Sequence, residues 1–182
     1  MALKSTIFKA ELGIADMDRP YYGTHTLTIA RHPSENDERM MVRVLAYALN
    51  ADEALAFGKG LSSTEEAALS RRDLTGAIEQ WIEVGLPDAR LLKKAAGRAD
   101  QVLVYAYGGR AVGLWWAQQR ADLEHLGNLR VIELPIDATV ALGRLAERNM
   151  NLQCTVQEGQ VWLGDERETV HFEPGVLFPV PA

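Results

Sequence analysis

The chain has 182 residues, of which 47% are apolar and 24% are charged, and this balance predicts one folded domain over residues 1–182. Its net charge of −6 argues against general electrostatic binding of nucleic acid, without excluding a local basic rim around a small acidic site. One cysteine, no long apolar run and no secretion-signal pattern exclude an intramolecular disulfide and predict no membrane span, so we expect a cytoplasmic protein.

The N-terminal part predicts a β-hairpin followed by a helix. Residues 6–14 and 22–30 carry alternating apolar and polar side chains around a polar turn, which predicts two antiparallel strands. Ser34 and the acids after it form a helix-start pattern, in which the Ser34 side chain caps free backbone amides. We expect this helix to run to about Leu49.

Glu38 is unusual in this helix because it lies four residues before Val42, on the predicted apolar stripe. An acid there has two explanations: contact with the positive end of the helix, or a functional role inside the fold. Residues 50–72 are mostly polar, and we expect a long loop with one short helix over residues 63–69.

The middle of the chain predicts alternating strands and helices. The expected strands are residues 77–84, 101–107 and 129–134, and the expected helices are residues 88–99 and 111–126. This order is typical of parallel strands joined by right-handed crossovers. Asp137 is expected to cap a further helix that runs to about Arg148.

The C-terminal region predicts β structure again. Residues 152–156 and 161–163 form a hairpin pattern, with a further strand over residues 169–172, and the prolines from Pro174 onwards are expected to end the ordered structure. The predicted fold class is therefore α/β, with a mixed central sheet, flanking helices, an N-terminal β-hairpin and a C-terminal β-hairpin.

Two acids, Asp73 and Glu83, are the strongest candidates for chemistry. Glu83 lies inside an apolar strand, where a carboxylate is costly unless a cation pairs with it. Two such acids brought together invite a divalent ion, and oxygen ligands suit Mg²⁺ or Mn²⁺, which activates water at a phosphoryl group. The alternative is structural: Glu83 at an exposed strand end, and Asp73 capping the turn at Thr75-Gly76.

Several strings in the sequence resemble the YaeQ family of small bacterial proteins, and the resemblance covers nearly the whole chain. They are Arg31-His32-Pro33-Ser34-Glu35, Glu38-Arg39-Met40-Met41, Trp81-Ile82-Glu83-Val84-Gly85-Leu86-Pro87-Asp88 and Lys93-Lys94-Ala95. That family is similar in fold to the restriction-endonuclease-like, PD-(D/E)xK group. The resemblance implies a mixed central sheet flanked by helices, with an acid on the first helix, an Asp on one strand and a Glu-x-Lys on the next.

The resemblance also implies roles for individual residues. Glu38, Asp73 and Glu83 match the three acids and would hold Mg²⁺ or Mn²⁺. Gly85 occupies the lysine position, so the motif is broken, and Lys94 or Lys93 would have to reach back from the following helix to orient water or offset phosphate charge. The alternative for both lysines is a solvated helix face.

Two functional hypotheses follow from these residues. The first is a metal-dependent, nuclease-like phosphodiester hydrolase with a degenerate site. The second is a non-catalytic domain that keeps the scaffold for binding protein or nucleic acid. Two weaker features are a set of arginines that would face phosphate or simply solvent (Arg71, Arg72, Arg98 and Arg110), and the Trp115-Trp116 pair, of which one ring is expected to pack and the other to form an exposed contact point.

Overall fold

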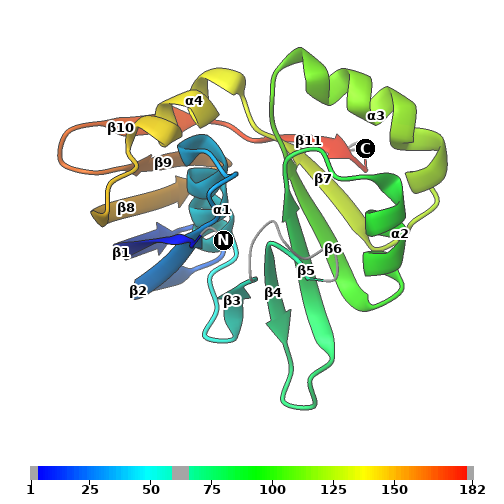
Figure 1. Ribbon diagram of the computed structural model, residues 1–182, viewed down its shortest axis with the longest axis horizontal. Coiled ribbons are helices and arrows are strands. Elements are labelled where there is room, and N and C mark those ends of the chain that lie inside the picture. Colours follow the sequence, from blue (N-terminus) through cyan, green and yellow to red (C-terminus); the bar gives the residue numbers. More distant parts are fainter. Residues whose placement is uncertain (1–3, 59–65, 180–182) are drawn as a thin grey trace.

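The computed structural model describes residues 4–58 and 66–179, and within them it contains two mixed sheets and four helices (Figure 1). A five-stranded sheet, a helical layer, a six-stranded sheet and a second helical layer follow one another. The prediction of a mixed α/β fold is confirmed, and the six-stranded mixed sheet has helices on both faces. The two terminal hairpins, which were expected as separate features, form a second sheet.

The two predicted terminal hairpins join to form the five-stranded sheet. Its order is β10-β9-β8-β1-β2, from β1 (Thr6–Asp16), β2 (Tyr21–Arg31), β8 (Asn149–Gln157), β9 (Gln160–Gly164) and β10 (Thr169–Phe172). β1 and β8 lie side by side and parallel, with Leu12 beside Leu152. The second sheet exists because neither hairpin can bury its apolar face alone, whereas the joined sheet covers a helix with it.

The six-stranded sheet has the order β11-β7-β6-β5-β4-β3. Its strands are β3 (Leu55–Phe57), β4 (Leu69–Arg72), β5 (Ile78–Val84), β6 (Ala99–Ala106), β7 (Leu129–Glu133) and β11 (Gly175–Phe178). β5, β6 and β7 are parallel, as the alternating pattern predicts, and the outer strands are antiparallel to their neighbours.

Three of these strands correct the sequence analysis. β3 and β4 lie where a loop was expected, and β11 lies beyond Pro174, where order was expected to end. Each has only three or four residues, too few to show a period of two, so pairing with neighbours rather than local sequence creates them. Residues 63–65 of the expected short helix lie outside the described residues, and its last position, Leu69, begins β4.

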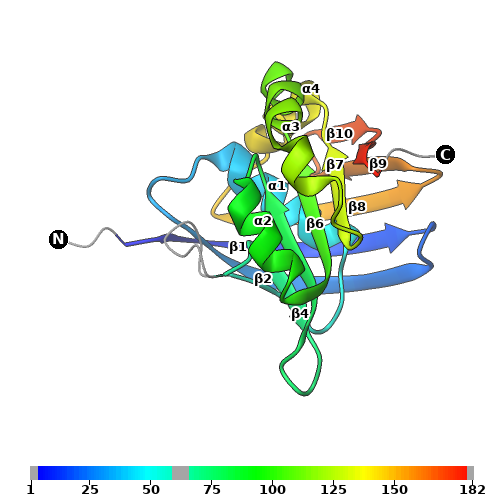
Figure 2. The ribbon, with the colours of Figure 1, turned by 90° about the vertical axis from the view of Figure 1, so that its right-hand side faces the viewer.

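The helices fill two layers. They are α1 (Asp37–Leu49) and α4 (Ile136–Arg144) between the sheets, and α2 (Ala89–Ala96) and α3 (Arg110–Leu123) on the far face of the six-stranded sheet (Figure 2). Asn36, not Ser34, caps α1 and accepts the Arg39 N–H at 2.8 Å. The Ser34 N–H instead donates to the His32 ring. α4 begins at Ile136, so Asp137 lies in its first turn and does not cap it.

α1 is the centre of the fold, because every residue from 40 to 48 is buried. That run includes Arg43, a residue that is 1% exposed and whose Nε donates to Glu35 Oε2 at 2.9 Å. Glu35 is buried as well, so the two charges neutralise each other inside the protein. The apolar stripe that the sequence predicts for this helix is therefore only part of its buried surface.

Trp115 and Trp116 both pack. Trp115 is 7% exposed and donates its indole N–H to the Pro87 carbonyl at 2.8 Å. Trp116 is partly buried, with its ring centroid 5.2 Å from that of Phe178 on β11. The expectation that one of the two rings forms an exposed contact point is wrong, because β11 was not foreseen.

Candidate functional site

Glu83 is a buried carboxyl near the C-terminal end of β5. It shares a strand face with Trp81, which packs into the core beneath α2 and α3. Glu83 is only 6% exposed, and the Trp81 Nε1–H donates to its Oε1 at 2.8 Å. Burial raises the pKa of Glu83 to about 7, although the bonds from Trp81 and from the Ala68 amide and the charge of Arg39 oppose the shift.

A second set of groups shares this electrostatic neighbourhood. Burial raises the pKa of Tyr107, which follows β6, to about 12; Arg39 lowers it, and Glu38 and Glu35 raise it further. Arg39 is ion-paired with Glu35 within the start of α1. The C-terminal ends of β5 and β6 and the N-terminal turns of α1 therefore bring opposite charges together, at the sheet edge where α/β proteins usually bind ligands.

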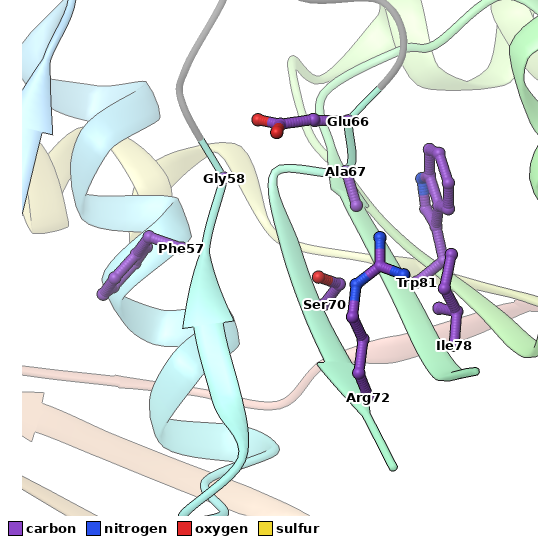
Figure 3. Close-up of a pocket in the computed structure, with 8 residues that line it drawn as sticks. All are labelled: Phe57, Gly58, Glu66, Ala67, Ser70, Arg72, Ile78 and Trp81. Carbon is purple, nitrogen blue, oxygen red and sulfur yellow. The ribbon is translucent and has the colours of Figure 1, made fainter. Parts of the chain in front are cut away.

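A pocket of about 180 Å³ lies on the same face of the six-stranded sheet as Trp81 (Figure 3). Ser70 and Arg72 are two residues apart on β4, and Ser70 pairs with Trp81 on β5, so all three side chains lie on one face. The Arg72 guanidinium reaches along the pocket and donates to the Gly76 carbonyl at 2.9 Å. Trp81 thus belongs to both features: its ring lines the pocket and its N–H binds Glu83.

Asp73 lies at the other end of β5, in the turn between β4 and β5. Its Oδ1 accepts the Thr75 N–H at 2.8 Å, the Thr75 hydroxyl at 2.6 Å and the Ala77 N–H at 3.0 Å. The Thr75 hydroxyl bond, joined by backbone N–H bonds, holds the pKa of Asp73 below its usual value. The strand from Ile78 to Glu83 spans about 17 Å, so the structure does not bring Asp73 and Glu83 together.

Glu38, the third predicted acid, contacts α4. It lies in the first turn of α1, where its Oε2 accepts the Thr139 hydroxyl of α4 at 3.1 Å. Its place in the first turn of α1 agrees with contact at the positive end of that helix, where Glu38 is also half-buried against α4. The functional explanation stays a prediction.

Lys93 and Lys94 lie in the last turn of α2, on exposed surface. The chain leaves that turn to enter β6 at Ala99, which pairs with Ile78 at the start of β5. Both lysines are therefore nearer the Asp73 end of β5 than the Glu83 end. Lys93 Nζ lies 3.4 Å from Asp122 of α3.

Gly85 has a φ of +96°, a conformation that a lysine adopts only with strain. Its N–H donates to the Tyr105 carbonyl at 2.9 Å, which fixes the turn after β5. The turn itself therefore gives a backbone reason for the missing lysine.

The predicted Mg²⁺ or Mn²⁺ ligands do not form one donor set. Among residues 4–58 and 66–179, no three His, Cys, Asp or Glu side chains are grouped so that they could hold a metal ion. Asp73 is occupied by its turn, Glu38 by α4, and Glu83 by an indole. We therefore derive no step through an ion.

Sequence reasoning missed several of the residues that surround Glu83 and the pocket. Tyr107 lies in none of the quoted strings, and Arg39 lies in one but was given no role, although the spacing of Glu35 and Arg39 is that of a helical ion pair. Ser70 and Arg72 have a strand spacing hidden in a segment expected to be loop. Arg72 was the one predicted phosphate-facing arginine that lines the pocket, whereas Arg71 lies 3.9 Å from Glu79.

The described helices include none with the length and apolar character needed to cross a membrane.

Comparison with known proteins gives a consistent result. A family model described as "YaeQ protein" matches residues 1–174. The uncharacterized protein YaeQ of Salmonella typhi is 45% identical over 174 residues, covering 95% of this chain and 96% of that protein. Its counterpart in Escherichia coli (strain K12) is 43% identical over 171 residues, covering 93% and 94%.

Solved structures agree. The crystal structure of YaeQ protein from Xanthomonas axonopodis pv. citri superposes with a TM-score of 0.92 at 46% identity, covering 95% of this chain and 98% of the other. That of YaeQ protein from Pseudomonas syringae gives 0.91 at 37% identity, covering 95% and 96%.

Proposed function

This chain belongs to the YaeQ family, and we propose that it is a nuclease-like domain that acts on a phosphodiester beside Trp81, with Glu83 as its proton-transfer group. The proposal includes the restriction-endonuclease-like assignment of the six-stranded sheet. One observation carries it: Glu83 is a buried carboxyl with a pKa of about 7, hydrogen-bonded to an indole that lines a pocket.

The chemistry of these residues suits a phosphodiester. A carboxyl with a pKa near 7 has both protonation states populated at neutral pH, so it can take a proton from water or give one to a leaving oxygen. Strongly shifted carboxyls beside a pocket are typical of functional sites. The Arg72 guanidinium and the Ser70 hydroxyl, both in the pocket lining, are donors that suit phosphate oxygens.

The binding of Mg²⁺ or Mn²⁺ and a catalytic role for Lys93 and Lys94 stay predictions. The separation of Asp73 from Glu83 gives an ion no shared site among the described residues, and Lys93 and Lys94 lie toward the far end of β5. Nucleic acid as the partner is likewise part of the proposal, supported by the arginine in the pocket and opposed by the net charge of −6.

The test is turnover of bis(p-nitrophenyl) phosphate, and of single- and double-stranded DNA and RNA, with and without MnCl₂. We expect measurable hydrolysis that Glu83→Gln lowers by about 10²-fold or more, because the amide cannot exchange a proton. Arg72→Ala should mainly raise KM. Glu79→Gln, at a partly exposed position on the same strand, is the matched control and should leave hydrolysis unchanged. Wild-type protein inert toward every substrate, or a fully active Glu83→Gln variant, would refute the proposal.

The second candidate is a non-catalytic domain that binds nucleic acid or protein on the same scaffold. The φ of +96° at Gly85 favours it, because that turn excludes the lysine that hydrolysis in the PD-(D/E)xK group uses. It predicts that Arg72→Ala weakens binding of an oligonucleotide while Glu83→Gln leaves that binding intact. Calorimetric titration with Mn²⁺ tests the predicted metal centre separately from these two functions. Binding heat that is lost in Glu83→Gln and also in Asp73→Asn would support a metal ion held by both acids.

A further inference from the structure

The outward face of the five-stranded sheet is a second surface, independent of Glu83 and its pocket. Among the described elements, α1 and α4 cover its inward face and no helix covers the outward one (Figure 1). Along β8 the inward residues are buried, and the outward ones are four amides and a hydroxyl: Asn149, Asn151, Gln153, Thr155 and Gln157.

Three adjoining hollows follow these side chains, and we call them together the groove along β8. A hollow of about 380 Å³ lies over Gln153 and Thr155, and an adjoining one of about 360 Å³ shares Asn151, Asp165 and Glu166 with it. A third, of about 270 Å³, adjoins the second at Asn149. From Thr155 to Asn149 the groove is about 20 Å long.

An aromatic platform closes one end of the groove. The Trp162 indole stacks on the His171 ring, with centroids 4.6 Å apart and planes 1° from parallel. β9 lies between β10 and β8, and Trp162 of β9 pairs with Thr155 of β8. His171 covers one face of the indole, and Trp162 lines the same hollow as Thr155.

The floor of the groove is shaped by a glycine. Gly13 of β1 pairs with Gln153, and a Cβ on Gly13 would lie 2.3 Å from Gln153 Oε1. The Gln153 amide therefore lies across Gly13 and along the floor. On its other side Gln153 pairs with Gly164, so this row of the sheet carries one polar side chain between two residues without any.

The lining identifies the class of ligand. β8 is paired on both sides, so an added peptide strand finds no free backbone groups there, and recognition must come from side chains. Amides and a hydroxyl bind uncharged polar groups. Carboxylates at the rim, from Asp165, Glu166 and Glu147, accept bonds from hydroxyls and repel phosphates.

Two cations do lie at the end away from Trp162. Lys9 and Arg148 line the third hollow, but Arg148 donates to the Ile7 carbonyl at 3.1 Å and lies over the Phe8 ring. Arg167, at the rim, is paired with Glu147 and Asp165. The outward side chains of β8 itself are uncharged, so these cations lie at its Asn149 end and at the rim.

From these observations we propose that the groove along β8 binds a neutral oligosaccharide, with a sugar ring on Trp162 and hydroxyls on the Asn and Gln side chains. The fused ring of an indole offers sugars an apolar face, and the amides and carboxylates supply paired donors and acceptors.

The test is titration of the full chain with maltohexaose, cellohexaose and chitohexaose, followed by tryptophan fluorescence and by amide chemical shifts. We expect at least one saccharide to bind saturably and to shift the amides of β8 and β9. Trp162→Ala should weaken that binding about tenfold, and Trp162→Phe less, because a ring remains. Gly13→Ala should weaken it severalfold by displacing the Gln153 amide.

Thr26→Ala is the matched control, because Thr26 is outward on the same sheet but outside the groove, and it should not change the affinity. The proposal is overturned if none of the three saccharides binds at millimolar concentration, or if binding survives Trp162→Ala unchanged. It is also overturned if oligothymidylate, and no saccharide, shifts the β8 amides. The chemical-shift map of the wild-type chain decides the question even where a variant fails to fold.

Discussion

Glu83 shows how the burial of one residue can be expected from its strand while its partner cannot. An acid within an apolar strand predicts burial with a compensating group, and Glu83 is buried. The compensating group is a neutral indole N–H from the same strand face rather than a metal ion shared with Asp73. Desolvation without a nearby cation in direct contact is what raises the pKa of this carboxyl to about 7.

The raised pKa of Glu83 predicts how stability depends on pH. Between 4.5 and about 7 the folded state keeps the proton that the unfolded state has lost, so the free energy of unfolding should fall as pH rises, by about 3 kcal/mol in total. Above about 7 both states are ionised and the contribution is lost. Glu83→Gln, which never ionises, should remove this slope and be more stable than wild type above pH 7.

Urea unfolding at a series of pH values measures this slope. Glu79→Gln is the control, because Glu79 is more than a third exposed on the same strand and should leave the slope unchanged. A Glu83→Gln variant with the same pH dependence as wild type would show that this carboxyl is not protonated in the folded protein.

At the scale of elements, the two turns that flank β5 separate the residues that the sequence grouped. The turn before β5 uses Asp73 to bind three donors, and the turn after it uses Gly85 to reach a positive φ. Both are local structures with sequence signals, since Asp followed by Thr-Gly favours a turn. Because β5 itself lies between them, one turn cannot supply a ligand to the other.

Gly85→Ala tests the backbone argument. Nothing lies within 4 Å of a Cβ built on Gly85, so only the φ of +96° opposes the substitution. We expect it to lower the free energy of unfolding by about 1–2 kcal/mol. Gly113→Ala is the matched control: its site is equally open but helical, and it should raise stability by about 0.5–1 kcal/mol. Equal effects of the two variants would contradict the strain at Gly85.

At the scale of the whole molecule, the chain crosses between the sheets more than once. β1 and β2 begin the five-stranded sheet, the six-stranded sheet follows, and β8, β9 and β10 return to complete the first. β11 then crosses back to pair with β7. The burial of α1 depends on these crossings, because its buried residues pack against both sheets.

The prediction of one domain over residues 1–182 can therefore be tested by truncation. A chain of residues 1–148 lacks β8, the central strand of the five-stranded sheet, and leaves β1 with β2 as its partner on one side only. We expect it not to fold, and the full chain to unfold in one transition by circular dichroism and tryptophan fluorescence. Adding residues 149–182 in trans is the control and should restore structure. A truncated chain with a dispersed amide spectrum would show two independent units.

The sequence by itself determined the elements whose signal is local. Hydrophobic periodicity and turn residues predicted the terminal hairpins, the parallel core from β5 to β7 and its crossover helices. For Glu83 the sequence left open a buried carboxyl or an exposed strand end, and the structure shows the buried one. The endpoints shifted by a few residues where a neighbouring side chain, such as Asn36 in place of Ser34, made the cap.

Only the tertiary structure decided which elements meet. The parallel pairing of β1 with β8 joins the two ends of the chain, and the short strands β3, β4 and β11 exist because neighbouring strands offer them backbone partners. The same is true of the site: Asp73, Lys93 and Lys94 lie toward one end of β5 and Glu83 lies at the other. A strand rises about 3.3 Å per residue, so residues at its two ends are far apart even when they are close in sequence. No local pattern shows which distant segments lie beside each end instead.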